Sequence, residues 1–273
     1  MKKFEGILIC TDLDGTLLSS DKTISRENSE AIEYFKSEGG AFTFITGRPP
    51  RISTGICNMV LPNAPFGCLN GGGLYDHVSK KYLWYEETPR ACLELVDDVY
   101  RKLERIGIQV NTLENIYFSR ENSATENFCR ITDLPCCHKH HFDIDETIAK
   151  IVFLSDDPED IRELASFLNS HPRANEFGFV SSELTLYEIL PKGINKGSVL
   201  PKLCEHLGID IKRSIAVGDY DNDVGMLKAA GVGIAVANAS AAAKAAADLV
   251  TVSNEENAIA KIIYDLESGA IVL

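Results

Sequence analysis

A buried strand that ends in two acidic residues is the feature that most constrains this chain. Residues 6–11 (GILICT) form a continuous apolar run, which is typical of a strand covered on both faces, and Asp-Leu-Asp-Gly follows at once. Residues 25–39 have helical spacing, with Ser25 as the predicted N-cap and a Gly-Gly pair at the end, and residues 41–45 form a second apolar run. A strand, a helix and a strand in this order predict a parallel pair of strands.

The C-terminal third repeats this pattern. It predicts a strand over residues 214–217, a helix that reaches residues 227–230 and another strand over residues 232–236. An alanine-rich helix over residues 241–247 follows, and Ser240 is placed to start it. This part therefore looks like the other half of the same parallel sheet.

The segment between these halves has a different character. Its patterns predict a hairpin over residues 74–85, a helix with Thr88 as cap and Pro89 at its first position, a helix from the Asp157 cap to about residue 169, and strands over residues 108–110, 116–118, 148–154, 177–180 and 184–190. Strands and helices inserted between two halves of a parallel sheet suggest a separate domain. We therefore predict an α/β fold with a Rossmann-like parallel sheet core, residues 1–84 and 190–273, and an inserted α+β domain, residues 85–189.

Charge and hydropathy exclude some classes of partner. The chain has 273 residues and a formal net charge of −13, and it has no lysine and arginine run long enough to form a basic face. Nucleic acid is therefore not expected as a partner. No apolar run approaches the roughly 20 residues that span a bilayer, and the first strand leads straight into acidic residues, unlike a cleavable signal. We expect a cytoplasmic protein without a membrane partner, and the sequence leaves its oligomeric state open.

Eight cysteines raise the question of disulfides. Cys10, Cys57, Cys68, Cys92 and Cys204 each lie among apolar neighbours, where a thiol serves as a small buried hydrophobe. Disulfides are rare in the cytoplasm. We therefore expect no structural disulfide.

Four polar elements follow one another along the predicted core. Asp12 and Asp14 follow the first strand, Thr46 follows the second, Lys196 precedes a helix, and Asp219 lies in a Gly-Asp-x-x-Asn-Asp string after a third strand. The carboxyl ends of parallel strands share one edge of the sheet, where α/β proteins bind ligands. Taken singly, Asp-x-Asp is more often a solvated turn, Thr46 could simply cap a helix, and Lys196 could be an exposed lysine. Their combination favours one shared site.

With these four elements in this order, the chain resembles the haloacid dehalogenase superfamily, specifically its Cof-type phosphatases with an α/β (type IIB) cap. The resemblance covers essentially the whole chain and implies that residues 85–189 form a cap domain for substrate specificity. It implies that Asp12 is the nucleophile and that Asp14 is the general acid and base. It also implies that Thr46 and Lys196 hold the transferring phosphoryl group.

The same resemblance implies a Mg²⁺ site. Asp219 would bind the ion together with Asp12 and the backbone carbonyl of Asp14, and Asp223 and Asn222 would support them. Mg²⁺ is a hard ion that prefers oxygen ligands, so carboxylates and a carbonyl suit it.

The chemistry of the residues agrees with these roles. A carboxylate can attack phosphorus and form an acyl phosphate, but attack of an anion on an anion requires positive charge, which Mg²⁺ and Lys196 supply. Thr46 can donate a hydrogen bond to the developing charge, and Asp14 can protonate the leaving oxygen and later deprotonate water. The predicted substrate contacts are Thr46, Gly47, Arg48, Lys196 and Asn222.

The leading prediction is a Mg²⁺-dependent phosphatase that hydrolyses a small phosphorylated metabolite through an aspartyl-phosphate on Asp12, with a sugar phosphate as the leading candidate. One alternative is a phosphomutase, which would return the phosphoryl group to its substrate. Another is a non-catalytic metabolite-binding protein, which the intact set of carboxylates disfavours. The fold predicts only the class of substrate and leaves the metabolite open.

Two further motifs lie outside the predicted site. The cluster Cys136-Cys137-His138-Lys139-His140-His141 carries the ligand types of zinc, but neighbouring residues on an extended chain point to opposite faces and the usual spacer between cysteines is missing. We do not predict a metal site there. The string Asn70-Gly71-Gly72-Gly73 predicts a tight turn, either in a hairpin or where the backbone approaches substrate.

Overall fold

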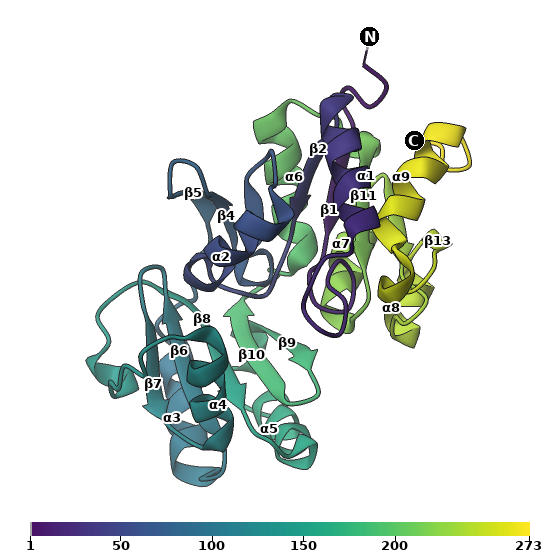
Figure 1. Ribbon diagram of the computed structural model, residues 1–273. Coiled ribbons are helices and arrows are strands. Elements are labelled where there is room, and N and C mark those ends of the chain that lie inside the picture. The colour runs from purple at the N-terminus through teal and green to yellow at the C-terminus, as the bar shows by residue number, and fades with distance from the viewer. Residues whose placement is uncertain (1) are drawn as a thin grey trace. The chain divides into compact units, whose positions relative to one another are not determined.

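The computed structural model describes residues 2–273, which form two compact units (Figure 1). Unit 1 combines the described residues up to Tyr85 with Asn195–Leu273, and unit 2 consists of Glu86–Ile194. The predicted α/β fold with a parallel sheet core is confirmed, and the core is built from both ends of the chain.

Unit 1 contains the parallel sheet and its helices. Its elements are β1 (Leu8–Thr11), α1 (Arg26–Ser37), β2 (Ala41–Phe44), α2 (Pro50–Val60), β3 (Phe66–Cys68), β4 (Gly73–Asp76), β5 (Lys81–Tyr85), α6 (Lys196–Leu207), β11 (Ser214–Gly218), α7 (Val224–Ala229), β12 (Val232–Ala235), α8 (Ala241–Ala246), β13 (Leu249–Val250) and α9 (Ala258–Ser268). The strand order β13-β12-β11-β1-β2 is parallel throughout, and β3, β4 and β5 form a separate antiparallel sheet. Because β1 lies between β11 and β2, the residues that follow these three parallel strands lie side by side at one edge of the sheet.

Helices cover both faces of this parallel sheet. Leu8 and Cys10 of β1 and Ala216 of β11 pack against α6 and α7. Residues of a strand alternate between faces, so their neighbours point to the opposite face, where α1 and α9 pack against each other (Figure 1). The Ser25 side chain accepts a hydrogen bond from Asn28 and caps α1, as the sequence predicts.

Unit 2 contains one antiparallel sheet with helices packed on it. Its elements are α3 (Cys92–Lys102), β6 (Gly107–Thr112), β7 (Ile116–Arg120), α4 (Ser123–Thr132), β8 (Ile148–Leu154), α5 (Pro158–Asn169), β9 (Phe177–Glu183) and β10 (Leu186–Pro191). The strand order is β7-β6-β8-β10-β9. One face of this sheet packs with α3 and α5 in an apolar core.

The predicted start of α3 at Thr88 and Pro89 is wrong. The helix begins at Cys92, with Ala91 at the N-cap position. Thr88 cannot cap it because its hydroxyl donates to the carbonyl of Ala149 at 2.7 Å and its amide donates to that of Ile148 at 2.8 Å. Tertiary contacts to β8 therefore outweigh the local preference for a capped helix.

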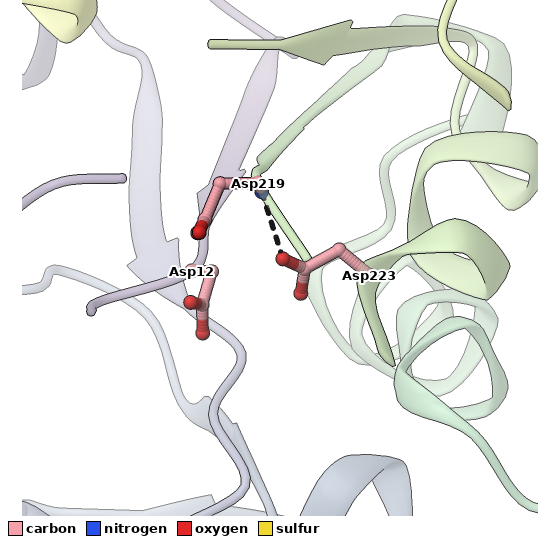
Figure 2. A group of neighbouring side chains, drawn as sticks. All are labelled: Asp12, Asp219 and Asp223. Atoms are coloured by element: carbon pink, nitrogen blue, oxygen red, sulfur yellow. Dashed lines mark hydrogen bonds between the residues drawn. The ribbon is translucent and has the colours of Figure 1, made fainter. Parts of the chain in front are cut away.

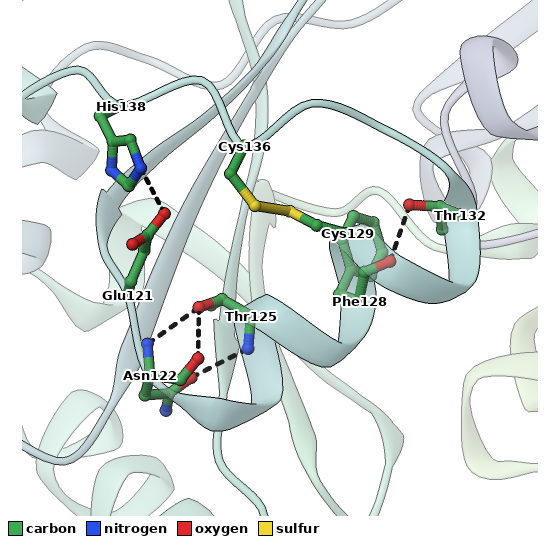
Figure 3. The surroundings of a disulfide bond; sticks show 8 residues. All are labelled: Glu121, Asn122, Thr125, Phe128, Cys129, Thr132, Cys136 and His138. Carbon is green, nitrogen blue, oxygen red and sulfur yellow. Dashed lines mark hydrogen bonds and ion pairs between the residues drawn. A yellow bond between two sulfur atoms is a disulfide. The ribbon is translucent and has the colours of Figure 1, made fainter.

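The expectation of no disulfide is also wrong. Cys129 and Cys136 form a disulfide in unit 2, with their Cα atoms 6.1 Å apart (Figure 3). Cys129 lies on α4, a helix that the sequence patterns did not predict, and the chain after this helix brings Cys136 back beside it. The five cysteines predicted as buried hydrophobes are all buried, as expected.

None of the helices described in residues 2–273 is long and apolar enough to cross a membrane.

Candidate active site

The polar residues predicted at the strand ends come together in unit 1. In the sheet register Thr11 of β1 lies between Phe44 of β2 and Val217 of β11. The residues that follow these three positions therefore meet at one edge of the sheet. The amide of Asp12 donates to the carbonyl of Val217 at 2.8 Å, which fixes the chain directly after β1.

Lys196 lies in the centre of this group. Its ammonium Nζ is 2.6 Å from Asp12 Oδ1 and 2.5 Å from Asp223 Oδ1, and the residue is only 1% exposed. Asn195 caps α6 directly before it, so the first residue of that helix carries the charged group into the site. Burial alone would lower the pKa of Lys196, but the two carboxylates outweigh it and hold that pKa above its usual value. Lys196 is therefore a fixed positive charge.

Asp12, Asp219 and Asp223 form the acidic part of the site (Figure 2). Each can offer one carboxylate oxygen, and these three atoms lie within 4.8 Å of one another. The Thr16 hydroxyl donates to Asp219 Oδ1 at 2.6 Å. Asp223 Oδ2 accepts hydrogen bonds from the amides of Asp219 and Tyr220 at 2.9 and 3.0 Å, so Asp223 also shapes the loop that presents Asp219.

The charges of this group favour a cation. Burial raises the pKa of Asp12 to about 8, with further increase from Asp223 and Asp219 and an opposing effect of Lys196. Burial likewise raises the pKa of Asp219 to about 6. One ammonium against three carboxylates leaves excess negative charge, which a divalent ion with oxygen ligands would neutralise. The residues present therefore fit such an ion.

Gly15 leaves room for this arrangement. Its φ is +80°, a left-handed conformation that glycine adopts without strain. A Cβ atom at this position would lie 2.6 Å from Asp219 Oδ2. The glycine of Asp-Leu-Asp-Gly is thus required both by the turn and by the carboxylate beside it.

Asp14 has a different environment from Asp12. Its carboxylate lies outside the group of three and pairs with Lys22 Nζ at 2.8 Å and with Arg48 Nη2 at 2.7 Å. Burial would raise the pKa of Asp14, but Arg48 and Lys22 outweigh it and hold that pKa below its usual value. The two aspartates of the motif therefore have pKa values shifted in opposite directions.

Asn70, which the sequence analysis left outside the site, lies beside Thr46, Gly47 and Asn222. The carbonyl of Thr46 accepts from the amide of Asn70 at 3.1 Å, and Asn222 Nδ2 donates to Asn70 Oδ1 at 3.1 Å. A Cβ atom on Gly47 would lie 3.0 Å from the same Asn70 oxygen. Asn70 is buried and has a φ of 53°, so it occupies the tight turn that the Asn-Gly-Gly-Gly string predicts. The Asn-Gly-Gly-Gly string was therefore the feature of the sequence that could have indicated a place for Asn70 in the site.

The Cys136–His141 cluster has other contacts. Cys136 is in the disulfide, and His138 Nε2 lies 2.5 Å from Glu121 (Figure 3). The group of side chains among residues 2–273 that could hold a metal ion is the acidic group of unit 1, and it does not include this cluster.

Comparison with known proteins identifies the family. The haloacid dehalogenase-like hydrolases match residues 9–263. The chain belongs to this family. This haloacid dehalogenase-like hydrolase is 27% identical over 263 residues to the 5-amino-6-(5-phospho-D-ribitylamino)uracil phosphatase YitU of Bacillus subtilis, covering 94% of this chain and 96% of the relative. It is 28% identical to the pyridoxal phosphate phosphatase YbhA of Escherichia coli, covering 94% and 97%.

Solved structures agree with this assignment. A haloacid dehalogenase-like hydrolase from Bacteroides thetaiotaomicron has a TM-score of 0.81 and 26% identity, covering 95% of this chain and 99% of that one. The subclass IIB sugar phosphatase BT4131 has a TM-score of 0.82 at 20% identity, covering 97% and 100%, and so shares the fold. The protein is a Cof-type phosphatase of the haloacid dehalogenase superfamily.

Proposed function

We propose that this phosphatase is Mg²⁺-dependent and hydrolyses a small phosphorylated metabolite through an aspartyl-phosphate on Asp12. The observation that carries the proposal is the pairing of buried Asp12 with Lys196, 2.6 Å away, inside a group of three carboxylates. A nucleophilic carboxylate, a fixed cation and a site for a second cation are what attack on a phosphate dianion requires.

Two carboxylates are the best candidates to hold the ion. Lys196 engages Oδ1 of Asp12 and Thr16 engages Oδ1 of Asp219, which leaves the second oxygen of each for Mg²⁺. The backbone carbonyl of Asp14 would be a third ligand. Asp223 would support the ion indirectly, because its two oxygens already accept from Lys196 and from backbone amides. The bound ion would neutralise phosphate charge and so lower the barrier to attack by an anion.

The protein groups would act in two steps. First, a carboxylate oxygen of Asp12 forms a bond to phosphorus while the bond from phosphorus to the leaving oxygen breaks, and the leaving oxygen takes a proton from Asp14. Second, Asp14 accepts a proton from water, the water oxygen bonds to phosphorus, and Asp12 is released with inorganic phosphate. Lys196 and the Thr46 hydroxyl would hold the phosphoryl oxygens, with Gly47, Arg48 and Asn222 as further contacts.

Asp14 would need a change of partners to act as an acid. Its ion pairs with Arg48 and Lys22 favour the charged carboxylate. Substrate phosphate carries negative charge and would compete for these two cations, which would raise the pKa of Asp14 when substrate binds. The acid form would then be available in the complex where it is used.

The substrate is proposed to be a small phosphorylated metabolite, with a sugar phosphate as the leading candidate. The two named relatives act on a phosphorylated ribitylamino-uracil and on pyridoxal phosphate, which share a phosphate on a small polar molecule. We propose that unit 2, Glu86–Ile194, serves as the cap and selects the substrate, because the residues gathered in unit 1 handle the phosphoryl group alone.

Substitution of the nucleophile tests this function. Asp12→Asn should reduce phosphate release by at least about 1,000-fold, because the amide cannot form the covalent intermediate. Asp145→Asn is the matched control, since the Asp145 side chain is 91% exposed. The assay measures inorganic phosphate from a panel of phosphorylated metabolites, before and after chelation and with added Mg²⁺.

Chelation should abolish release and Mg²⁺ should restore it. Near-normal release by Asp12→Asn would refute the aspartyl-phosphate, and full activity in excess chelator would refute the metal requirement. Conversion of a substrate to its isomer without phosphate release would identify a phosphomutase instead.

A further inference from the structure

Residues 69–71 form a left-handed turn beside the candidate active site. Leu69, Asn70 and Gly71 have φ values of 56°, 53° and 91° in succession. Leucine is strained in this region of backbone conformation, whereas asparagine tolerates it better than most residues that carry a side chain. Such a run persists only where surrounding contacts hold it, and backbone strain of this kind concentrates at functional sites.

Two backbone amides of the turn hold the loop that carries Thr46. The amide of Asn70 donates to the carbonyl of Thr46 at 3.1 Å, and the amide of Leu69 donates to the carbonyl of Arg48 at 3.1 Å. Both bonds join backbone groups, so they depend on the left-handed path of the chain and not on its side chains. The turn therefore fixes the loop that follows β2.

The turn also packs against the start of α6. A Cβ atom on Gly71 would overlap the carbonyl oxygen of Asn195 and would lie 2.8 Å from the Cα atom of Lys196. Asn195 is the N-cap of α6, and Lys196 carries the buried ammonium. Glycine permits this close approach because it has no Cβ atom. The turn thus contacts two of the segments that supply predicted phosphoryl contacts.

The side chain of Asn70 reaches a third such segment. Its Oδ1 accepts from Asn222 Nδ2 at 3.1 Å, and Asn70 is only 1% exposed, so water does not compete for this bond. Asn222 lies between Asp219 and Asp223 in the loop after β11. The bond engages one of the two side-chain amide hydrogens of Asn222, which leaves the other for a phosphate oxygen.

We propose that Asn70 is a positioning residue for phosphoryl transfer: its side chain holds the Asn222 amide in the orientation in which that amide donates to a phosphoryl oxygen. An amide that rotates freely has to be ordered during the reaction, and a donor fixed in advance avoids this cost. Asparagine suits the position because it combines tolerance of a left-handed backbone with an acceptor oxygen. This inference rests on the proposed function, in which Asn222 contacts the phosphoryl group.

A double-mutant cycle with nitrophenyl phosphate as substrate tests the proposal. Asn70→Gly removes the side chain and keeps a residue that adopts the left-handed conformation without strain. It should lower kcat/KM by about 10-fold, because one hydrogen bond between neutral groups is lost. In the Asn222→Ala background the same substitution should change kcat/KM by less than about twofold, because the group through which Asn70 acts is absent.

Asn257→Gly is the matched control. Asn257 is another left-handed asparagine of unit 1, with a φ of 59°, and it lies at the start of α9 without a capping bond from its side chain. This control should leave kcat/KM unchanged, and a loss as large as that of Asn70→Gly would overturn the proposal. Equal losses for Asn70→Gly in both backgrounds would show a purely structural role and overturn it, as would an unchanged kcat/KM in Asn70→Gly or Asn222→Ala.

The cycle separates this proposal from the proposed function. Near-normal phosphate release by Asp12→Asn would refute the aspartyl-phosphate and leave the cycle between Asn70 and Asn222 valid. Equal losses in both backgrounds would refute the role of Asn70 and leave that of Asp12 intact.

Hydrogen exchange in the wild-type protein tests the same contact without any substitution. In ¹⁵N-labelled protein, the side-chain NH₂ protons of Asn222 should exchange with water at least about tenfold more slowly than those of Asn58, an exposed residue of α2. Slow exchange supports the proposal even where a variant does not fold. Exchange as fast as that of Asn58 would mean that Asn70 does not hold Asn222, and it would overturn the proposal.

Discussion

Replacement of Lys196 by methionine should destabilise unit 1 severely. The Lys196 ammonium lies 2.6 Å from Asp12 and 2.5 Å from Asp223 and is 1% exposed, so the variant leaves two buried carboxylates without their cation. Removing one partner of a buried ion pair costs about 3–5 kcal/mol, because the remaining charge is neither hydrated nor compensated. Methionine keeps an unbranched side chain at the site, so the loss reports the charge more than the packing.

Urea unfolding in the absence of divalent ions measures this loss. The sole tryptophan, Trp84, lies on β5 in unit 1 and packs against its apolar core, so its fluorescence follows this unit. With a slope of about 2 kcal/mol per M urea, the midpoint should fall by about 1.5–2.5 M. The control Lys261→Met removes an exposed pair on α9 and should cost about 0.3–0.5 kcal/mol.

A second substitution checks the cause. Asp223→Asn in the Lys196→Met background should recover part of the stability, because a neutral amide needs no cation and its oxygen can still accept a backbone amide. Saturating Mg²⁺ should also recover part of it. A loss for Lys196→Met as small as that for Lys261→Met would refute the idea that Lys196 compensates buried charge.

Two further predictions concern the metal and Asp14. Mg²⁺ affinity should rise as the pH increases from about 6 to about 8, because the raised pKa values of Asp219 and Asp12 mean that protons must leave before the ion binds. Calorimetry in buffers of different ionisation enthalpy would detect the released protons. A pH-independent affinity would contradict the assignment of these ligands. Asp14→Asn should greatly slow hydrolysis of an alkyl phosphate but spare the attack on nitrophenyl phosphate, whose leaving group needs no proton. Asn cannot accept the proton of water in the second step, so rapid mixing should show a burst of at most about one nitrophenol per active site. Equal slowing of both substrates without a burst would show that Asp14 is not the acid.

Local sequence patterns predicted much of unit 1. The buried strand before Asp12, the Ser25 cap and the polar residues after each strand depend on neighbouring residues, so they can be recognised without a structure. The gathering of Asp12, Thr46 and Asp219 at one edge also follows from the sequence, since parallel strands bring their carboxyl ends together.

Features that depend on distant residues were missed or predicted wrongly. The start of α3 was predicted wrongly because the Thr88 hydroxyl donates a hydrogen bond to Ala149 of β8, which lies 61 residues further along the chain. The Cys129–Cys136 disulfide joins residues only seven apart, but it depends on α4 and on the return of the chain after it, neither of which the sequence analysis predicted. The role of Asn70 was left open because its hydrogen bonds to Thr46 and Asn222 join segments that are far apart in the chain.

The sequence by itself determined which groups carry the chemistry, because motif residues at strand ends are a local property of the chain. Tertiary structure alone decided the electrostatics: Lys196 lies 184 residues from Asp12, yet the fold places it 2.6 Å away and removes both from water. Burial and charge spacing change the pKa and the binding capacity of a side chain, and both are set by packing between distant segments.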